Sequence, residues 1–194
     1  LVKEMSECGV LGAGRIGKAA ELVAEMFGDS DCTVFLTLAG PLVPGGLRRI
    51  IVDLIDQGYV NVVVTTGANI VHDIVEALGY RHIRGTFLAE DRKLKAKSIG
   101  RIGDIFVEQE AFKHLEKWMY QVLEDIPKEK KERLSVTQLL FEMGKRIQDP
   151  ESILAVAAKK KVPIICPAFM DSIAVFHLWV FGQDKKIRID PLLD

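Results

Sequence analysis

Residues 60–73 read Val-Asn-Val-Val-Val-Thr-Thr-Gly-Ala-Asn-Ile-Val-His-Asp, and this stretch constrains the fold more than any other. Its run of β-branched residues predicts a strand that is buried on both faces. Apolar residues then recur at helical spacing from Ile70 to Leu78, so a helix follows directly. Gly67 permits the tight turn between strand and helix, and Asn69 is predicted to accept from the first free N–H groups of the helix.

The turn at residues 65–69 therefore connects a strand to a helix N-terminus, where backbone N–H groups point outward. In an open α/β sheet, anions and nucleotides bind at such a position. The same pattern also fits an ordinary βα connection, so this loop alone does not identify a binding site.

A second strand–loop–helix unit comes earlier in the chain. Residues 32–38 predict a buried strand and residues 47–57 a helix, and the loop between them contains two prolines and three glycines. Such a loop suits the close approach of a ligand or a crowded crossing of chain segments. Two successive units predict a parallel sheet with right-handed crossovers, which places both loops at the carboxyl edge of the sheet.

A third apolar strand is predicted at residues 162–166, followed by a helix at 173–181. Asp171 lies between them, either as a helix N-cap or as an acid that binds a ribose hydroxyl or a cationic amine. The remaining predicted elements are helices at 112–123, 135–146 and 150–160 and strands at 102–107 and 186–189.

Residues 12–17 match Gly-x-Gly-x-x-Gly and precede a predicted helix from Lys18 to Phe27. A dinucleotide fingerprint needs a buried strand before the glycines and an acid at the end of the next strand. Residues 5–11 are not such a strand, and the strand at 32–38 ends without a carboxylate. We interpret the match as a glycine-rich entry to a surface helix.

The 194 residues are 48% hydrophobic and 27% charged, which is enough for one core, and a net charge of −1 argues against a nucleic acid or anionic membrane partner. Cys8, Cys32 and Cys166 lack metal-site spacing and predict buried, reduced thiols. No apolar run reaches the ~18 residues of a membrane span, and no signal peptide is recognised, so we expect a cytoplasmic protein. The length and composition predict a single domain, residues 1–194. The chain starts at Leu1 rather than Met and stops at Asp194 directly after a strand-like segment, so we expect it to be truncated at both ends.

These loops and their order resemble deoxyhypusine synthase, and the Thr-Thr-Gly-Ala-Asn-x-x-His-Asp form looks like the archaeal branch of that family. The segments that carry the resemblance are residues 2–26, 33–79, 99–104, 143–145, 149–152 and 162–172. The resemblance implies a three-layer Rossmann-like parallel sheet with helices on both faces and NAD at the carboxyl ends of the strands. It also implies a homotetramer with active sites at dimer interfaces.

The reaction that the resemblance implies uses NAD without net consumption. A hydride leaves spermidine, the 4-aminobutyl group passes as an imine to an enzyme lysine and then to one lysine of the translation factor 5A precursor, and the hydride returns. Such a site needs carboxylates for the polycation, a desolvated amine nucleophile and backbone donors for the dinucleotide.

Carried over position by position, the resemblance assigns NAD contacts to Gly40, Pro41, Leu42, Val43, Pro44, Thr66, Gly67, Ala68 and Asp171. It assigns substrate contacts to His72 and Asp73. Eukaryotic members carry glutamates in place of Val71 and His72, and an aspartate in place of Phe176, so the amine substrate can differ.

The family's catalytic lysine lies in a later Gly-Lys-Ile segment that this chain lacks. The lysines that do not fit that segment are Lys145, Lys185 and Lys186. We therefore predict no catalytic residue and no metal ligand within this chain.

Two alternatives remain beside a truncated deoxyhypusine synthase. One is a naturally short, inert NAD-binding paralogue that acts as a regulatory subunit, which a stop codon after Asp194 would favour. The other is a homospermidine-type polyamine synthase, which would place labelled spermidine carbons only in small polyamines.

Overall fold

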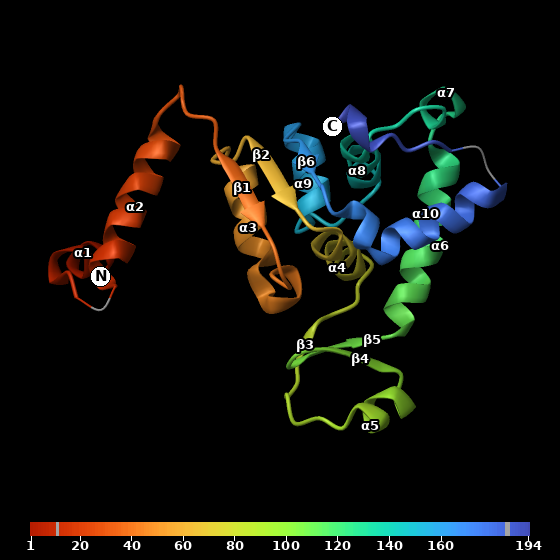
Figure 1. Ribbon diagram of the computed structural model, residues 1–194, viewed down its shortest axis with the longest axis horizontal. Coiled ribbons are helices and arrows are strands. Elements are labelled where there is room, and N and C mark those ends of the chain that lie inside the picture. The colour runs from red at the N-terminus through yellow and green to blue at the C-terminus, as the bar shows by residue number, and fades with distance from the viewer. Residues whose placement is uncertain (11, 185–186) are drawn as a thin grey trace. The chain divides into compact units, whose positions relative to one another are not determined.

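The computed structural model describes residues 1–10, 12–184 and 187–194, and the chain divides into two compact units, residues 1–34 and 35–194 (Figure 1). Leu11, Lys185 and Lys186 lie outside the described residues. The statements made from the sequence about Lys185 and Lys186, including the start of the strand predicted at 186–189, therefore stay predictions.

The first unit consists of two packed helices, α1 (Val2–Cys8) and α2 (Ala13–Gly28). A Cβ on Gly17 would lie 2.3 Å from the Cβ of Ser6, so the glycine permits the close crossing of the two helices. Most of α2 is exposed. The Gly-x-Gly-x-x-Gly match is thus the entry to a surface helix, as predicted, and the element before it is a helix rather than a strand.

The second unit contains a parallel sheet of β1 (Phe35–Leu38), β2 (Val62–Thr65) and β6 (Ile164–Ile165), in that order. Helix α3 (Arg48–Asp56) connects β1 to β2, and a longer crossover connects β2 to β6. The predicted α/β class with parallel strands and crossover helices is confirmed.

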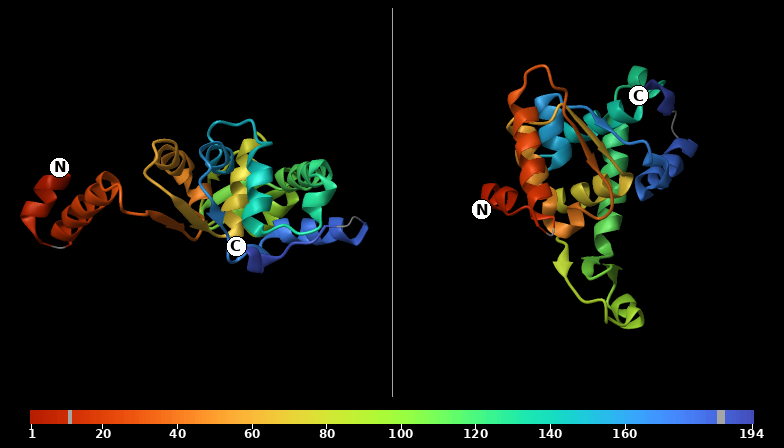
Figure 2. Two further views of the ribbon diagram at one scale, coloured as in Figure 1. Left: turned by 90° about the horizontal axis from the view of Figure 1, so that it is seen from above. Right: turned by 60° about the vertical axis from the view of Figure 1, so that its left-hand side comes forward.

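Helices cover one face of this sheet. Helix α9 (Ile153–Lys160) packs against α3 on the same side of the strands (Figure 2, left), and α8 (Val136–Gly144) packs on α9. Val63 is buried on that face, whereas Phe35, on the other face, is 57% exposed and Val64 is half-buried. Strand β2 is therefore not buried on both faces as predicted, because its composition permits burial but the neighbouring layers decide it.

A small antiparallel sheet, in the order β3-β5-β4, follows helix α4. The sequence predicted one strand in this part of the chain, at residues 102–107, whereas β4 and β5 form a hairpin about Gly103, which has a φ of +62°. The bounds of the remaining elements are α4 Gly67–Ala77, β3 Ile83–Arg84, α5 Asp91–Ala96, β4 Ile99–Ile102, β5 Ile105–Glu108, α6 Glu110–Asp125, α7 Lys128–Lys131, α10 Ile173–Asp184, and the short turns Val43–Leu47, Phe169–Asp171 and Pro191–Leu193.

The helices predicted at 135–146 and 150–160 are confirmed, each with a serine cap. Ser135 and Gln138 form a reciprocal capping box at α8, and the Ser152 side chain accepts from Ala155 N at α9. Such caps satisfy N–H groups that the helix itself leaves free, which fixes where each helix begins.

The cysteines only partly follow the prediction of buried thiols. Cys166 is buried, and this burial, with a smaller contribution from the charge of Asp194, raises the pKa of its thiol to about 12. Cys8, however, is exposed. Among the described residues, no helix has the length and apolar character that crossing a membrane requires.

Candidate functional site at the carboxyl edge of the parallel sheet

The loops that follow β1, β2 and β6 meet at one edge of the parallel sheet. Val43 N donates to Asn69 Oδ1 over 3.2 Å, which joins the first loop to the second. A Cβ on Gly67 would lie 2.4 Å from the Cβ of Ser172, so the second loop also touches the third. The three turns that the sequence assigned to a common rim are therefore brought together there.

Asn69 has a different role from the predicted helix cap. Thr66 is the residue that precedes α4, and Asn69 lies within its first turn. The Asn69 amide accepts from Val43 N and donates to the hydroxyls of Thr65, over 3.3 Å, and Thr66, over 3.4 Å. It fastens one loop to another, which a pattern read along one segment does not reveal.

The residues predicted to contact NAD fall into two groups at this rim. Those that are exposed or half-buried are Gly40, Pro41, Leu42, Thr66, Ala68 and Asp171, and those that are buried are Val43, Pro44 and Gly67. Of the exposed or half-buried group, Thr66 precedes α4 and Ala68 lies in its first turn. The first N–H groups of this 11-residue helix have no partner within the helix. Backbone donors and a helix dipole at this point suit an anionic group, so the residues present fit a dinucleotide phosphate.

Gly67 gives the first test of this geometry. Gly67→Ala places a methyl group against Ser172, and we expect a loss of about 1–3 kcal/mol in the free energy of unfolding, measured by urea denaturation. Gly45→Ala in the neighbouring loop is the control, because a Cβ there meets nothing within 4 Å. The second change Ser172→Gly should restore part of the loss, and a Gly67→Ala protein of unchanged stability would contradict the close approach.

Asp73 lies in the interior. Its side chain is fully buried, and its two oxygens accept from Arg48 Nε over 2.7 Å, Ser152 Oγ over 2.8 Å, and the backbone N–H groups of Ile153 and Leu154 over 3.0 Å each. The carboxylate thus caps α9 and pairs with α3. The sequence assigned Asp73 to a substrate position, which stays a prediction, and in the structure these four donors give its carboxylate an internal structural role.

Arg48, which the sequence analysis missed, is the centre of a buried ion network. Its Nη1 lies 2.8 Å from Asp149 Oδ2, and its Nε lies 3.7 Å from Glu76 Oε2 in addition to the contact with Asp73. Burial opposes the charge, but Asp73 and Asp149 together raise the pKa of Arg48 above its usual value. In the sequence Arg48 looked like an ordinary polar residue of an amphipathic helix.

His72 ends a chain of three hydrogen-bonded side chains. His82 Nδ1 lies 2.7 Å from Glu76 Oε1, and His82 Nε2 lies 2.8 Å from His72 Nδ1. His72 is only 9% exposed. Burial, and then the charge of His82, lower the pKa of His72 to about 4, against a weaker opposite effect of Glu76.

Glu76 and His82 were not singled out from the sequence. The four-residue spacing of His72 and Glu76 on one helix does place them on the same face, so this part of the cluster had a signal. His82 comes after the helix in a polar stretch, and its approach to His72 depends on the return of the chain.

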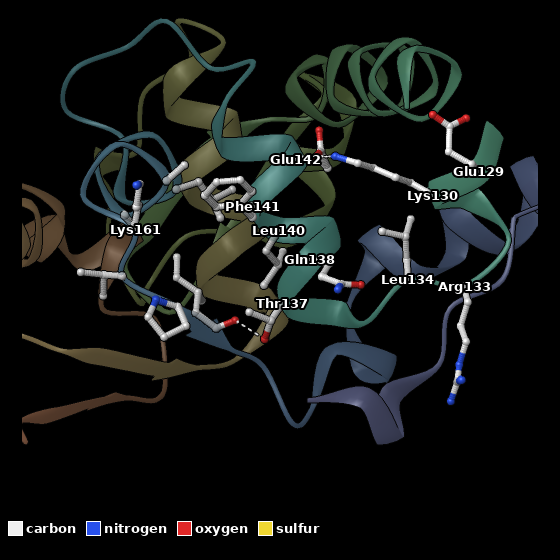
Figure 3. Close-up of a pocket in the computed structure, with 16 residues that line it drawn as sticks. Glu129, Lys130, Arg133, Leu134, Thr137, Gln138, Leu140, Phe141, Glu142 and Lys161 are labelled. Carbon is white, nitrogen blue, oxygen red and sulfur yellow. Dashed lines mark hydrogen bonds and ion pairs between the residues drawn. The ribbon is translucent and has the colours of Figure 1, made fainter. Parts of the chain in front are cut away.

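A separate cavity of about 640 Å³ lies between α8, α9 and the beginning of β6 (Figure 3). Its walls are mostly apolar, and Thr137 Oγ1 donates to Ile164 O within it over 3.0 Å. At its rim, burial opposes the ionisation of Glu142, but hydrogen bonds from Lys145, Arg146 and Lys130 lower the Glu142 pKa to about 2. The cavity contains none of the predicted NAD residues, so we place the candidate site at the three loops.

Comparison with solved structures supports the fold. A crystal structure of a candidate deoxyhypusine synthase from Entamoeba histolytica matches with a TM-score of 0.73 and 20% sequence identity, over 95% of this chain and 64% of that one. At this identity the match establishes the shared fold alone.

Comparison of sequences establishes the family. Over all 194 residues, the chain is 41% identical to a protein of Methanosarcina mazei and 40% identical to one of Methanothermobacter thermautotrophicus, both named probable deoxyhypusine synthase. It is also 35% identical to a deoxyhypusine synthase-like protein of Chlorobaculum parvum. The chain spans about 60% of the length of the two archaeal relatives. The family model described as deoxyhypusine synthase matches residues 1–194, and the chain therefore belongs to the deoxyhypusine synthase family.

Proposed function

We propose that this chain is the NAD-binding part of a deoxyhypusine synthase, which transfers the 4-aminobutyl group of spermidine to a lysine of the translation factor 5A precursor. The observation that carries the proposal is the meeting of the three loops at the N-terminus of α4, through the contacts of Val43 with Asn69 and of Gly67 with Ser172. Membership of the family supports the proposed reaction, and the meeting of the loops supports the proposed position of its cofactor.

The roles of the rim residues follow from their exposure. The N–H groups at the start of α4 would hold the phosphates, and the exposed Asp171 carboxylate would accept hydrogen bonds from ribose hydroxyls. Buried Val43, Pro44 and Gly67 would hold the loops in place. When bound, NAD would accept a hydride from the amine and would later return that hydride.

Asp171→Asn tests this assignment. A charged hydrogen bond to the cofactor contributes about 1.5–3 kcal/mol, so we expect NAD to bind roughly tenfold or more weakly, measured by isothermal titration. The control is Glu108→Gln, which removes an exposed carboxylate on β5. Equal loss in both variants would mean a non-specific charge effect, and unchanged affinity in Asp171→Asn would place the ribose elsewhere.

Transfer is tested with labelled spermidine, NAD and the factor 5A precursor. We propose that this chain lacks the catalytic lysine, so we expect NAD binding without transfer by the 194 residues alone. Label on the precursor in the presence of a full-length relative supports the assigned reaction, and label only in small polyamines favours the homospermidine-type alternative. A chain that binds NAD, transfers no label itself and changes the activity of the relative when the two are mixed supports the inert paralogue that acts as a regulatory subunit.

We also propose that the protein associates with itself into a tetramer. The helix α10 and the turn before it expose large apolar side chains, with Met170 67%, Phe176 58% and Trp179 61% exposed. A helix that is apolar on most of its faces is normally covered, which supports an interface at this position.

A further inference from the structure

The chain formed by Glu76, His82 and His72 determines where the protons lie on both imidazoles. A carboxylate only accepts hydrogen bonds, so the 2.7 Å contact with Glu76 requires a proton on His82 Nδ1. When His82 is neutral, its Nε2 carries a lone pair, and the 2.8 Å contact then requires a proton on His72 Nδ1. The proton-free nitrogen of His72 is consequently Nε2, which makes no hydrogen bond to any of the described residues.

The surroundings hold this arrangement in place. The side chain of His82 is 2% exposed and that of Glu76 is 16% exposed, so water competes little for either contact. Arg48 Nε lies 3.7 Å from the second oxygen of Glu76, so a guanidinium group faces the other side of the same carboxylate. The Phe112 ring meets His72 nearly at right angles, with ring centroids 6.2 Å apart, and limits its rotation. Burial keeps His72 uncharged, in agreement with its low pKa.

We propose that Glu76 and His82 are positioning residues that fix His72 as a hydrogen-bond acceptor, through Nε2, for a protonated amine of the substrate. This inference rests on the proposed function, because it assumes an amine that binds beside the loops of α4. A neutral imidazole connected to a buried carboxylate can accept from an ammonium group without carrying a negative charge of its own. Protonation of His82 would leave the bond to Glu76 unchanged but reverse the bond between His82 Nε2 and His72 Nδ1. His72 Nε2 would then carry the proton and become a donor, which repels the same ammonium group.

The tautomer is measured first, without any ligand, by two-dimensional ¹⁵N–¹H NMR of the histidine side chains at pH 8. We expect Nδ1 of His72 to be protonated and Nε2 to be proton-free. In Glu76→Gln and His82→Gln this preference should be lost, with the resonances of His72 moving toward those of a free imidazole. His114→Gln is the matched control, because it removes an imidazole that contacts Tyr80 instead.

Binding is measured next, with spermidine as the probe. We expect spermidine to shift the His72 Nε2 resonance, and His82→Gln to weaken spermidine binding about tenfold with NAD affinity unchanged. A protonated Nε2 in the unaltered chain, or a tautomer that His82→Gln leaves unchanged, would overturn the positioning role. Absence of a His72 response to spermidine would overturn its role toward the amine, whereas loss of NAD binding alone would count only against the proposed function.

Discussion

Asp73→Ala is expected to lower the free energy of unfolding by about 3–5 kcal/mol, because it leaves the buried Arg48 guanidinium without its closest partner. The same change removes the cap of α9, where Ser152 Oγ and two backbone N–H groups donate to the Asp73 carboxylate. The measurement is urea denaturation followed by circular dichroism at pH 7.

The matched control is Asp91→Ala, which breaks an aspartate–arginine pair at the surface. Asp91 is paired with Arg101 over 2.8 Å, but its side chain is 72% exposed, and we expect a loss of less than about 1 kcal/mol. A double variant, Asp73→Ala with Arg48→Leu, should lose less unfolding free energy than the sum of the losses in the two single variants, since the second change removes the unpaired charge. An Asp73→Ala protein as stable as Asp91→Ala would contradict the buried network.

The unaltered chain is expected to lose about 2 kcal/mol of stability between pH 7 and pH 5 through His72 alone. The pKa of His72 is about 4 in the folded chain against 6.5 for an ordinary histidine. The unfolded chain therefore takes up the proton first as the pH falls through 6.5, and folding is penalised progressively until the folded protein is itself protonated near pH 4. In His72→Gln this contribution should be absent, so its stability should fall less over the same range.

The comparison between the two proteins isolates His72 from other acid effects. Burial also lowers the pKa of His177, whose ring nitrogens have no hydrogen-bond partner among the described residues, but His177 is present in both proteins. The low pKa of Glu142 removes stability only at lower pH, below about 4.5. His114→Gln should behave as the unaltered chain, and an equal pH dependence of His72→Gln and the unaltered chain would contradict the assigned burial.

Much of the site was predictable because it depends on local pattern and topology. The spacing of apolar residues located β2, α4, α8 and α9 to within a few residues, because a helix or strand forms from neighbouring residues whose spacing is visible in the sequence. Parallel strands joined by helices bring their carboxyl ends to one edge, so residues 40–46, 66–73 and 167–172 were expected together before any contact was known.

The partners of individual side chains could not be obtained in this way. Asp73 meets Ser152 across 79 positions of the sequence, and His72 meets His82 only because the chain turns back after α4. Asparagine is a residue type that often caps helices, but Asn69 binds a different loop. Val64 belongs to a run of β-branched residues that is typical of a fully buried strand, but it is half-buried.

The order of residues was therefore enough to establish the parallel α/β class and the edge at which its loops gather, since both follow from short-range periodicity and the handedness of crossovers. The tertiary structure decided that Asp73 is internal, that His72 Nε2 has no hydrogen-bond partner among the described residues, and that Gly67 is required for the close approach of Ser172. Burial and hydrogen-bond geometry depend on segments that are distant in sequence, and the same aspartate or histidine can be a ligand or a structural anchor according to what folds against it.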